Sequence, residues 1–208
     1  MKLLITAGPT REPIDAVRFI GNRSSGRMGA AVAEAGTSAG HDVTLLMGPT
    51  MLAPSLAETC DVIRFNTTAE LEALLSDHFS SCDVLIMAAA VADYRPVTTT
   101  DIKLSRSGGG MTLQLEPTPD LVANIAAEKR EDQRIIAYAL EEPQVLESRA
   151  TEKMKRKNVD AIIANALGTM EADGVEAVLL TKTGERIAPG WMTKADFAKW
   201  LVDWLETL

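Results

Sequence analysis

The sequence predicts an α/β fold, in which helices pack against a mainly parallel β-sheet. Short, continuous apolar runs recur along the chain, helical patterns fill the stretches between them, and Gly or Pro residues stand at several junctions. Continuous apolar runs are typical of strands that are buried on both faces of a parallel sheet. Their alternation with helices is typical of an α/β sandwich.

Each predicted strand has an apolar interior. The first, residues 2–7, is ended by Gly8 and Pro9. The predicted strands are residues 2–7, 42–47, 61–65, 83–88, 134–139 and 160–164.

The predicted helices lie between these runs and carry recognisable end signals. Gly40 stops the first helix, and Thr67 and Thr68 are candidate N-caps of the second. The helices are residues 27–39, 69–79, 120–129 and 144–156.

Three segments depart from the alternation. Residues 103–115 carry a Ser-Gly-Gly-Gly run between short strand-like pieces, and residues 178–181 face residues 185–187 across a short turn, so both are predicted hairpins. We therefore expect a mixed sheet or a protruding flap. In the tail, residues 193–208, Phe197, Leu201 and Leu205 are spaced to form one face of an amphipathic helix.

Composition excludes several classes of protein. With 208 residues, 46% hydrophobic and 24% charged, the chain suits one globular domain and not a disordered, collagenous or coiled-coil chain. No apolar run is long enough to span a membrane, and the N-terminal stretch is too short for a secretory signal, so we expect a cytoplasmic protein. The formal charge of −8 argues against general binding of nucleic acid or anionic membranes.

Cysteine and histidine usage does not predict a metal site. Cys60 and Cys82 match no metal-ligand spacing, and His41 and His78 are too few for zinc. We interpret all four residues as structural.

A Gly-rich loop follows the first strand and leads into the first helix. It runs from Gly8 to Gly26, and such a turn points backbone N–H groups and a helix N-terminus at the carboxyl edge of the sheet, where anions bind. Arg27 and Met28 replace the Lys and Ser or Thr of a P-loop, and the dinucleotide Gly-x-Gly-x-x-Gly pattern is absent. A turn needed only for packing is the alternative.

The fourth strand ends in three alanines, residues 88–90, followed by Asp93. Small residues at a strand end let a flat ligand approach the backbone, and Asp93 comes where ligands bind in open α/β sheets. Lys103 follows beside the Gly-rich hairpin and suits transient neutralisation of phosphate charge. A packing contact with a solvated Asp, and a surface Lys, are the alternatives.

A cationic stripe lies near residue 150. Five of the 21 basic residues fall within residues 149–158, and Arg149, Lys153 and Lys157 share one helix face. Triphosphate binding is one interpretation. A solvated helix end that is favoured by the helix dipole is the other.

Four motifs carry a resemblance to a known family: residues 5–15 (ITAGPTREPID), 17–20 (VRFI), 22–29 (NRSSGRMG) and 88–96 (AAAVADYRP). The chain resembles the bacterial phosphopantothenoylcysteine synthetases, the phosphopantothenate–cysteine ligases of coenzyme A biosynthesis, from Lys2 to about Asn165 and more loosely beyond. The resemblance implies a three-layer, Rossmann-like, open and mainly parallel sheet with helices on both faces, and a homodimer. It covers only the ligase half of the fused bacterial enzymes, so no flavin is expected and a separate phosphopantothenoylcysteine decarboxylase is a candidate partner.

The implied reaction activates the carboxylate of 4′-phosphopantothenate with CTP, or with ATP, in the presence of Mg²⁺. This gives an acyl-nucleotide, which the amine of L-cysteine attacks. Because activation occurs on the substrate, the absence of a catalytic Ser or Cys set does not count against an enzyme.

The resemblance also implies roles for single residues. Asn22 and Lys103 are the expected catalytic residues, and the substrate-binding residues are Arg18, Asn22, Ala89 and Ala90. No metal ligand is assigned. The expected nucleotide-binding residues are Gly8, Met87, Ala88, Ala89, Asp93, Lys103, Pro119, Asp120, Leu121, Val122, Tyr138, Lys153 and Lys157.

This chain departs from the family pattern around the flap and the base. Where the family flap has Lys-x-Lys-Lys, this chain has KLSR at residues 103–106. Where the family has Lys-Asn before Pro-Asp, this chain has Pro117-Thr118. The family motif Phe-Ala-Ala-Glu-Thr is replaced here by YALEE at residues 138–142, and the family motif Ala-Asn-Asp by ANA at residues 164–166. These changes bear on nucleotide preference. The alternative functions are a non-catalytic nucleotide- or pantothenate-binding paralogue and an NAD(P)-dependent reductase.

Overall fold

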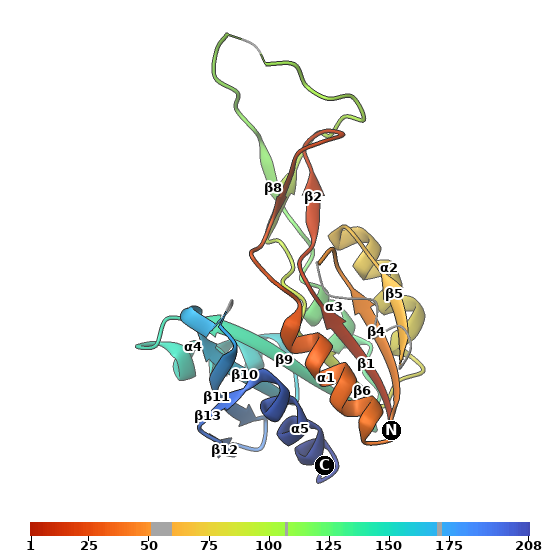
Figure 1. Ribbon diagram of the computed structural model, residues 1–208, viewed down its shortest axis with the longest axis vertical. Helices are drawn as coiled ribbons and strands as arrows, with labels where there is room; N and C mark the ends of the chain where they lie inside the picture. The colour runs from red at the N-terminus through yellow and green to blue at the C-terminus, as the bar shows by residue number, and fades with distance from the viewer. Residues whose placement is uncertain (51–59, 107, 170–171) are drawn as a thin grey trace.

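A mainly parallel sheet forms the centre of the protein in a computed structural model that describes residues 1–50, 60–106, 108–169 and 172–208 (Figure 1). The strands are β1 (Lys2–Ala7), β2 (Arg11–Pro13), β3 (Phe19–Gly21), β4 (Asp42–Met47), β5 (Asp61–Arg64), β6 (Val84–Met87), β7 (Tyr94–Pro96), β8 (Leu115–Pro117), β9 (Arg134–Glu141), β10 (Ala161–Ala166), β11 (Gly174–Thr181), β12 (Arg186–Ile187) and β13 (Trp191–Thr193). The helices are α1 (Arg27–Ser38), α2 (Thr68–Phe79), α3 (Leu121–Ala127), α4 (Leu146–Lys157), α5 (Lys194–Leu205) and the 3₁₀ turn η2 (Leu167–Thr169).

The strand order of the described sheet is β12-β11-β10-β9-β6-β1-β4-β5, with β13 paired to β11. Neighbours from β10 to β5 pair in parallel, whereas β11 is antiparallel to β10, β12 and β13. The sheet is therefore mixed, and all six runs predicted as buried strands form its parallel part.

Two hydrophobic cores lie on opposite faces of the sheet. Leu3 and Ile5 face the core that contains α1 and α5, whereas Leu4 faces the core that contains α2, α3 and α4, and each of these side chains is at most 1% exposed. Burial on both faces explains why the first strand is continuously apolar. The predicted three-layer arrangement is confirmed.

Local chemistry fixes the helix ends close to the predicted bounds. The Thr67 hydroxyl accepts a hydrogen bond from the Glu70 N–H at the start of α2, and Thr193 caps α5 through the Asp196 N–H in the same way. Asp120 caps α3 through the Ala123 N–H. In α5 the predicted apolar face is confirmed, because Phe197, Leu201 and Leu205 are at most 1% exposed.

The hairpin predicted at residues 178–187 is confirmed as β11–β12, with Leu179 opposite Ile187. The hairpin predicted within residues 103–115 is wrong. The paired strands are instead β7 and β8, and the described residues between them contain no strand; Ser107 lies outside the described residues. Three successive glycines, residues 108–110, disfavour a strand there and give the segment no side chains to pack.

An arm projects from the carboxyl edge of the sheet (Figure 1). It consists of the β2–β3 ribbon, the β7–β8 ribbon and the described residues between β7 and β8, 97–106 and 108–114, with β2 in contact with β7. The prediction of a protruding flap is thus confirmed in outline. The β2–β3 pair was not predicted.

None of the helices in the described ranges is both long enough and apolar enough to cross a membrane.

Candidate active site

Two adjoining cavities open at the carboxyl ends of the parallel strands. From β1 the chain continues to β4 on one side of the sheet, whereas β6 and β9 lie on the other side of β1, so the strand order reverses at β1. Ligands of open α/β folds bind at such a point. The first cavity, of about 430 Å³, lies at the start of α1 and is called here the α1 cavity. The second, of about 590 Å³, lies between α3 and α4 and is called the α3–α4 cavity. They share Val91, Asp93, Val122, Lys153 and Lys157.

The Gly-rich loop brings the N-terminus of α1 against the end of β1. Gly26, just before α1, has φ of +73°, which favours glycine. A Cβ added at Gly29 would lie 2.6 Å from the Cβ of Ala7, so only glycine permits this close packing of helix on strand. The first turn of α1 consequently lines the α1 cavity, where its N–H groups favour an anion.

The loop after β6, residues 88–93, is held by hydrogen bonds between its backbone and residues that follow or belong to β1 and β3. The Ala89 N–H donates to Thr6 Oγ1 (3.1 Å), and the Ala90 N–H donates to the Gly8 carbonyl (2.9 Å). Asn22 Nδ2 donates to the carbonyls of Ala90 (3.1 Å) and Val91 (3.0 Å). Asn22 is thereby held at the mouth of the α1 cavity, and its amide donates to substrate only by exchanging one of these bonds.

A buried polar cluster supports the same loop from behind. The Ala92 N–H donates to Thr10 Oγ1 (2.9 Å), which lies 3.3 Å from Thr68 Oγ1. The Thr68 hydroxyl in turn donates to Glu12 (2.6 Å). Thr10, Glu12 and Thr68 are at most 3% exposed, so this satisfied cluster rigidifies the loop that carries Asp93.

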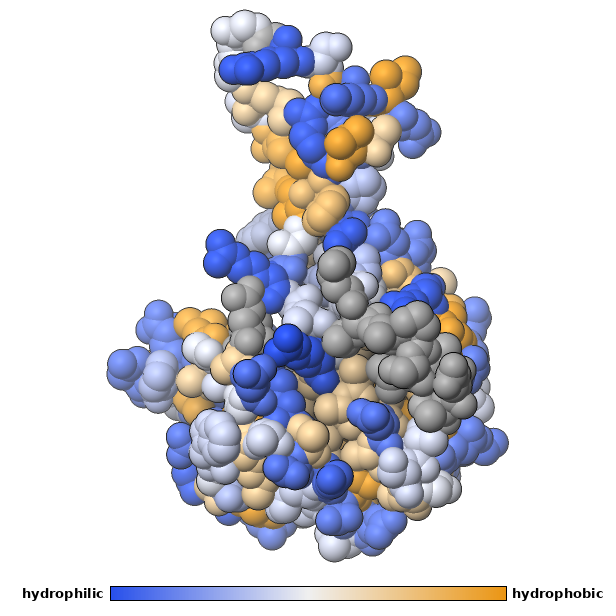
Figure 2. Space-filling view, in the orientation of Figure 1, coloured by the Kyte–Doolittle hydropathy of each residue, from blue (hydrophilic) through white to orange (hydrophobic). Residues whose placement is uncertain are grey.

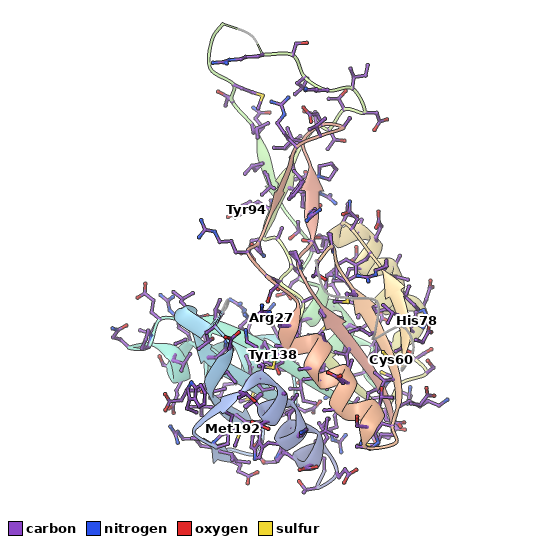
Figure 3. The ribbon with its side chains drawn as sticks, in the orientation of Figure 1. Arg27, Cys60, His78, Tyr94, Tyr138 and Met192 are labelled. Atoms are coloured by element: carbon purple, nitrogen blue, oxygen red, sulfur yellow. The ribbon has the colours of Figure 1, made fainter. Side chains whose placement is uncertain are left out.

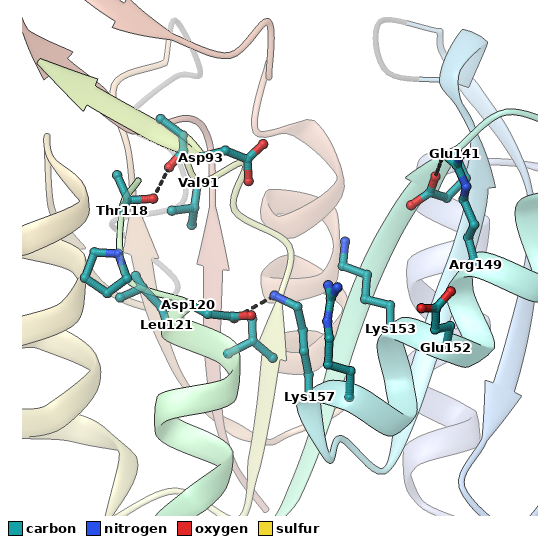
Figure 4. A pocket seen from close by; sticks show the side chains of 14 residues that line it. Val91, Asp93, Thr118, Asp120, Leu121, Glu141, Arg149, Glu152, Lys153 and Lys157 are labelled. Atoms are coloured by element: carbon teal, nitrogen blue, oxygen red, sulfur yellow. Dashed lines mark hydrogen bonds and ion pairs between the residues drawn. The ribbon is translucent and has the colours of Figure 1, made fainter. Parts of the chain in front are cut away.

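The cationic face of α4 points into the cavities (Figure 4). Lys157 Nζ donates to the Asp120 carboxylate (2.6 Å), and Lys153 Nζ donates to the Tyr138 carbonyl (3.4 Å). Burial, and then the charge of Lys157, lower the pKa of Lys153. Burial is the largest single influence on Asp120 and raises its pKa. The hydrogen bonds from Lys157 and the Ala123 N–H, with the charges of Lys157 and Arg156, together outweigh it, so the pKa lies below its usual value.

The α1 cavity carries an excess of positive charge. Its charged lining residues are Arg27, Lys153, Lys157 and Lys194 against a single carboxylate, Asp93, among the residues that the structure describes. Lys194 is 8% exposed, and burial followed by the charge of Arg27 lowers its pKa, while Asp173 raises it. A buried Lys in the first turn of α5 is also disfavoured by the helix dipole. This placement suits an anionic ligand.

Tyr138 of β9 also lines the α1 cavity, as does Arg27 at the start of α1; both are labelled in Figure 3. Its side chain is partly buried, and its hydroxyl oxygen is buried with no hydrogen-bond partner among the described residues. Burial raises the pKa of Tyr138, so the phenol is protonated at neutral pH.

Arg18 and Lys103, by contrast, belong to the arm. The Arg18 guanidinium pairs with the buried Asp15 carboxylate through Nε (2.9 Å) and Nη2, and Nη2 also donates to the Leu104 carbonyl (2.8 Å). The Leu104 N–H donates to Asp15 (3.1 Å). The hydrogen bond from Arg18 is the main reason why the pKa of Asp15 lies well below its usual value. This Asp15–Arg18 clamp ties the segment that carries Lys103 to the β2–β3 ribbon.

Apolar side chains are exposed along the arm (Figure 2). Ile102 is 76% exposed and Val17 is 60% exposed. The other exposed apolar side chains of the arm are Phe19, Tyr94, Val97, Leu104, Met111, Leu113 and Leu115. A surface of this kind marks an interaction site more often than free surface.

The structure thus brings together most of the predicted site residues, but not all. The predicted residues that line the α1 cavity are Asn22, Met87, Ala88, Ala89, Ala90, Asp93, Val122, Tyr138, Lys153 and Lys157. Those that line the α3–α4 cavity include Pro119, Asp120 and Leu121. Gly8 lies beneath the loop after β6. Arg18 and Lys103 line neither cavity.

Several lining residues were not predicted. No binding role was predicted for Arg27, which belongs to a family motif and begins a predicted helix, or for Lys194, which belongs to the predicted terminal helix. Asn165 reaches the α1 cavity from β10. The sequence does carry one signal for Lys194. This Lys follows the N-cap Thr193 directly, where the helix dipole disfavours a cation, so a binding role could have been suspected.

Among the described residues, no group of three His, Cys, Asp or Glu side chains is placed to hold a metal ion. Mg²⁺ in nucleotide sites is held largely by phosphate oxygens and water with one or two carboxylates. Asp93, at the junction of the cavities, is a carboxylate that fits this pattern.

Comparison with known proteins assigns the family. The model of the DNA/pantothenate metabolism flavoprotein C-terminal domain (DFP) matches residues 1–208. The chain is 36% identical over 197 residues to the coenzyme A biosynthesis bifunctional protein CoaBC of Escherichia coli K12, covering 91% of this chain and 48% of that protein. It is 45% identical over 166 residues to a cysteine/cysteine sulfinic acid decarboxylase of an unknown prokaryotic organism, covering 80% of this chain and 46% of that protein.

The fold comparison agrees. The crystal structure of the C-terminal domain of CoaBC superimposes with a TM-score of 0.83 at 34% identity, covering 99% of this chain and 94% of that one. The chain spans about half the length of these two curated relatives. The chain therefore belongs to the family of DNA/pantothenate metabolism flavoprotein C-terminal domains and has the fold of the C-terminal domain of CoaBC.

Proposed function

We propose that this chain is a phosphopantothenate–cysteine ligase. It joins 4′-phosphopantothenate and L-cysteine through an acyl-nucleotide, with CTP favoured over ATP, in the coenzyme A pathway of the cytoplasm. The observation that carries the proposal is the pair of connected cavities at the strand-order reversal, one of which combines a rigid small-residue loop, Asn22 and an excess of cations. Family membership supports the same reaction.

In the first half-reaction, a carboxylate oxygen of 4′-phosphopantothenate attacks the α-phosphorus of the nucleotide. The bond between the α-phosphorus and its bridging oxygen breaks, and pyrophosphate leaves with the electron pair. Lys153 and Lys157 from α4, with the N–H groups of α1, stabilise the charge that collects on the leaving group.

In the second half-reaction, the amine of cysteine attacks the acyl carbon, the bond from that carbon to the phosphate oxygen breaks, and the nucleoside monophosphate leaves with the electron pair. The proton lost from the amine passes to water. Asn22 orients the acyl carbonyl through its amide, which is neutral and so takes no proton from the amine. The rigid loop of residues 88–93 holds the reacting groups in place, and its alanines let the substrate lie against the backbone. Mg²⁺ carried by the nucleotide phosphates, with Asp93 as a protein carboxylate, supplies charge neutralisation when bound.

We also propose that the chain acts as a homodimer through its arm. The exposed apolar side chains of the arm suit a second copy of the same surface. In such a dimer the arm of one chain supplies Arg18 and Lys103 to the site of the other, which accounts for the distance of these residues from the cavities of their own chain. A separate phosphopantothenoylcysteine decarboxylase would consume the product.

The direct test is turnover of the purified chain with 4′-phosphopantothenate, cysteine, Mg²⁺ and either CTP or ATP. We expect pyrophosphate and the amide product in equal amounts, with faster turnover for CTP. Nucleotide binding without pyrophosphate release would instead indicate a non-catalytic paralogue. NAD(P) titration followed by fluorescence tests the reductase alternative, for which we expect no binding.

A further inference from the structure

The two ribbons of the arm leave the body beside Asp93. Thr10 directly precedes β2, Asp93 directly precedes β7, and Thr118 directly follows β8. These three positions and Ala92, called here the arm base, come from distant parts of the sequence and are joined by hydrogen bonds. A movement of either ribbon would therefore act first on the backbone that carries Asp93.

Two threonine hydroxyls hold the backbone of Ala92. On one side, Thr10 Oγ1 accepts a hydrogen bond from the Ala92 N–H (2.9 Å). On the other side, Thr118 Oγ1 donates to the Ala92 carbonyl (2.5 Å), and the Thr118 N–H donates to the Asp93 carbonyl (3.0 Å) (Figure 4). Ala92 is 4% exposed, so water competes little for these bonds.

A buried carboxylate anchors the Thr10 side of the arm base. Thr10 Oγ1 lies 3.3 Å from Thr68 Oγ1, and Glu12 of β2 accepts hydrogen bonds from the Thr68 hydroxyl (2.6 Å) and the Thr68 N–H (2.9 Å). Hydrogen bonds to a charged group are stronger than those between neutral groups, so they tie β2 firmly to the start of α2. The β2–β3 ribbon is thus fixed to the body next to the point that holds the β7–β8 ribbon.

Asp93 needs this support because its own side chain is not held. The side chain is exposed, and its carboxylate makes no hydrogen bond or ion pair within the described ranges. It nevertheless lines both cavities opposite the lysines of α4, and its charge acts to raise the pKa of Lys153 (Figure 4). The backbone of residues 92 and 93 therefore decides where this carboxylate lies.

We propose that Thr10 and Thr118 are positioning residues, which hold the Asp93 carboxylate at the junction of the two cavities. They act through the backbone of residues 92 and 93. The same bonds fix both ribbons at the arm base, so the arm can dock without displacing the carboxylate. The inference rests on the proposed function, in which Asp93 contributes to the nucleotide site.

Thr118→Val tests the proposal, because valine keeps the β-branched shape and removes the hydroxyl. With 4′-phosphopantothenate and cysteine saturating, we expect the KM for CTP to rise about fivefold at unchanged kcat, as for the loss of one hydrogen bond. Thr118→Ser keeps the hydroxyl and should keep the wild-type KM. Thr37→Val is the control, since Thr37 Oγ1 also donates to a backbone carbonyl, that of Ala33 (2.9 Å), but lines neither cavity.

Backbone amides provide a readout that does not depend on turnover. Thr118→Val should shift the amide resonance of Asp93 in NMR spectra of the free protein, because this nitrogen shares a peptide with the carbonyl that loses its donor; Thr118→Ser should not. Thr10→Val removes the acceptor of the Ala92 N–H and should speed hydrogen exchange there. An unchanged resonance or an unchanged exchange rate would overturn the inference.

A double-mutant cycle shows whether Thr118 acts through Asp93. Asp93→Asn should raise the KM for CTP at least as much as Thr118→Val does, and combining the two should raise it no further. A further rise of about fivefold in the double variant would mean that Thr118 acts on the fold in general, and would overturn the inference. An unchanged KM for Asp93→Asn or for Thr118→Val would overturn it too. A wild-type protein without turnover would instead remove the proposed function, and with it this role of both threonines.

Discussion

The body of the molecule and its arm place their functional residues in different ways. In the body, Asn22, Asp93 and the α4 lysines converge on two cavities that the sheet, the capped helices and a buried polar cluster fix in place. In the arm, Arg18 lies in the turn between β2 and β3, and Lys103 lies in the segment between β7 and β8. Neither has a core around it; both are held by the Asp15–Arg18 clamp among exposed apolar side chains. We therefore expect the body to bind substrate and the exposed arm to contact another protein surface.

The difference suggests a division of labour. A site made by packed strand ends can bind substrate in a single chain, because its groups are pre-organised. A group on an exposed ribbon contributes only after the ribbon docks. Substitutions in the body should therefore impair substrate binding or turnover whether or not the chain is associated. Substitutions in the arm should impair turnover by weakening self-association.

The largest effect is expected from Asn22→Ala in the body. We expect turnover to fall by at least about 100-fold, since the amide is proposed to orient the acyl group in the transition state. CTP affinity should change little in calorimetry. Asn124→Ala, on the surface of α3, is the control. Normal turnover would remove Asn22 from the mechanism.

Ile102→Asp tests the arm as a docking surface. Placing a charge on this exposed side chain should weaken self-association by about 30-fold, measured by sedimentation, and turnover should fall at low protein concentration. Leu208→Asp, which charges an exposed apolar residue of the body, should leave both unchanged. If the Ile102 variant associates normally, the arm is not the interface.

The α4 lysines should control the apparent affinity for the triphosphate. Lys153→Ala with Lys157→Ala should raise its KM by about 20-fold, because two charge-assisted contacts are lost. Lys155→Ala, exposed and outside both cavities, serves as the control. An unchanged KM would mean that the stripe is a solvated helix face.

The same cluster predicts a pH dependence. The pKa of Lys153 is lowered, so its cation exists below that pKa and is lost as the pH rises, earlier than for an ordinary lysine. Triphosphate KM should thus rise in the alkaline range, and Lys153→Arg should move the rise to higher pH. A KM that is flat across this range would contradict the assignment.

The smallest effect is expected from Asp15→Asn, which weakens the clamp. We expect trypsin to cleave after Lys103 a few times faster, because Leu104 loses its carboxylate partner. Binding of CTP to the body should not change. Asp132→Asn, at an exposed ion pair distant from the arm, is the control. Equal cleavage rates would show that the clamp does not hold the segment.

The sequence predicted the body far better than the arm. Strands such as β1 and β10 are buried on both faces, so their residues are continuously apolar and their signal is local. The β2–β3 ribbon and β7 are three residues long each and depend on one another for order, so no local pattern marks them. The site shows the same limit. Lys153 and Lys157 were found from helical spacing, whereas Lys194 reaches the α1 cavity only because α5 packs beside α1.

Complementation between two inactive variants tests most directly whether a body and a partner's arm form one site. Asn22→Ala carries an intact arm, and Lys103→Gln carries an intact body. When the two are mixed and exchange subunits, random pairing leaves about a quarter of the sites with both residues intact, so about a quarter of wild-type turnover should return. Turnover no greater than that of the separate variants would show that each arm serves its own chain, and would contradict the account.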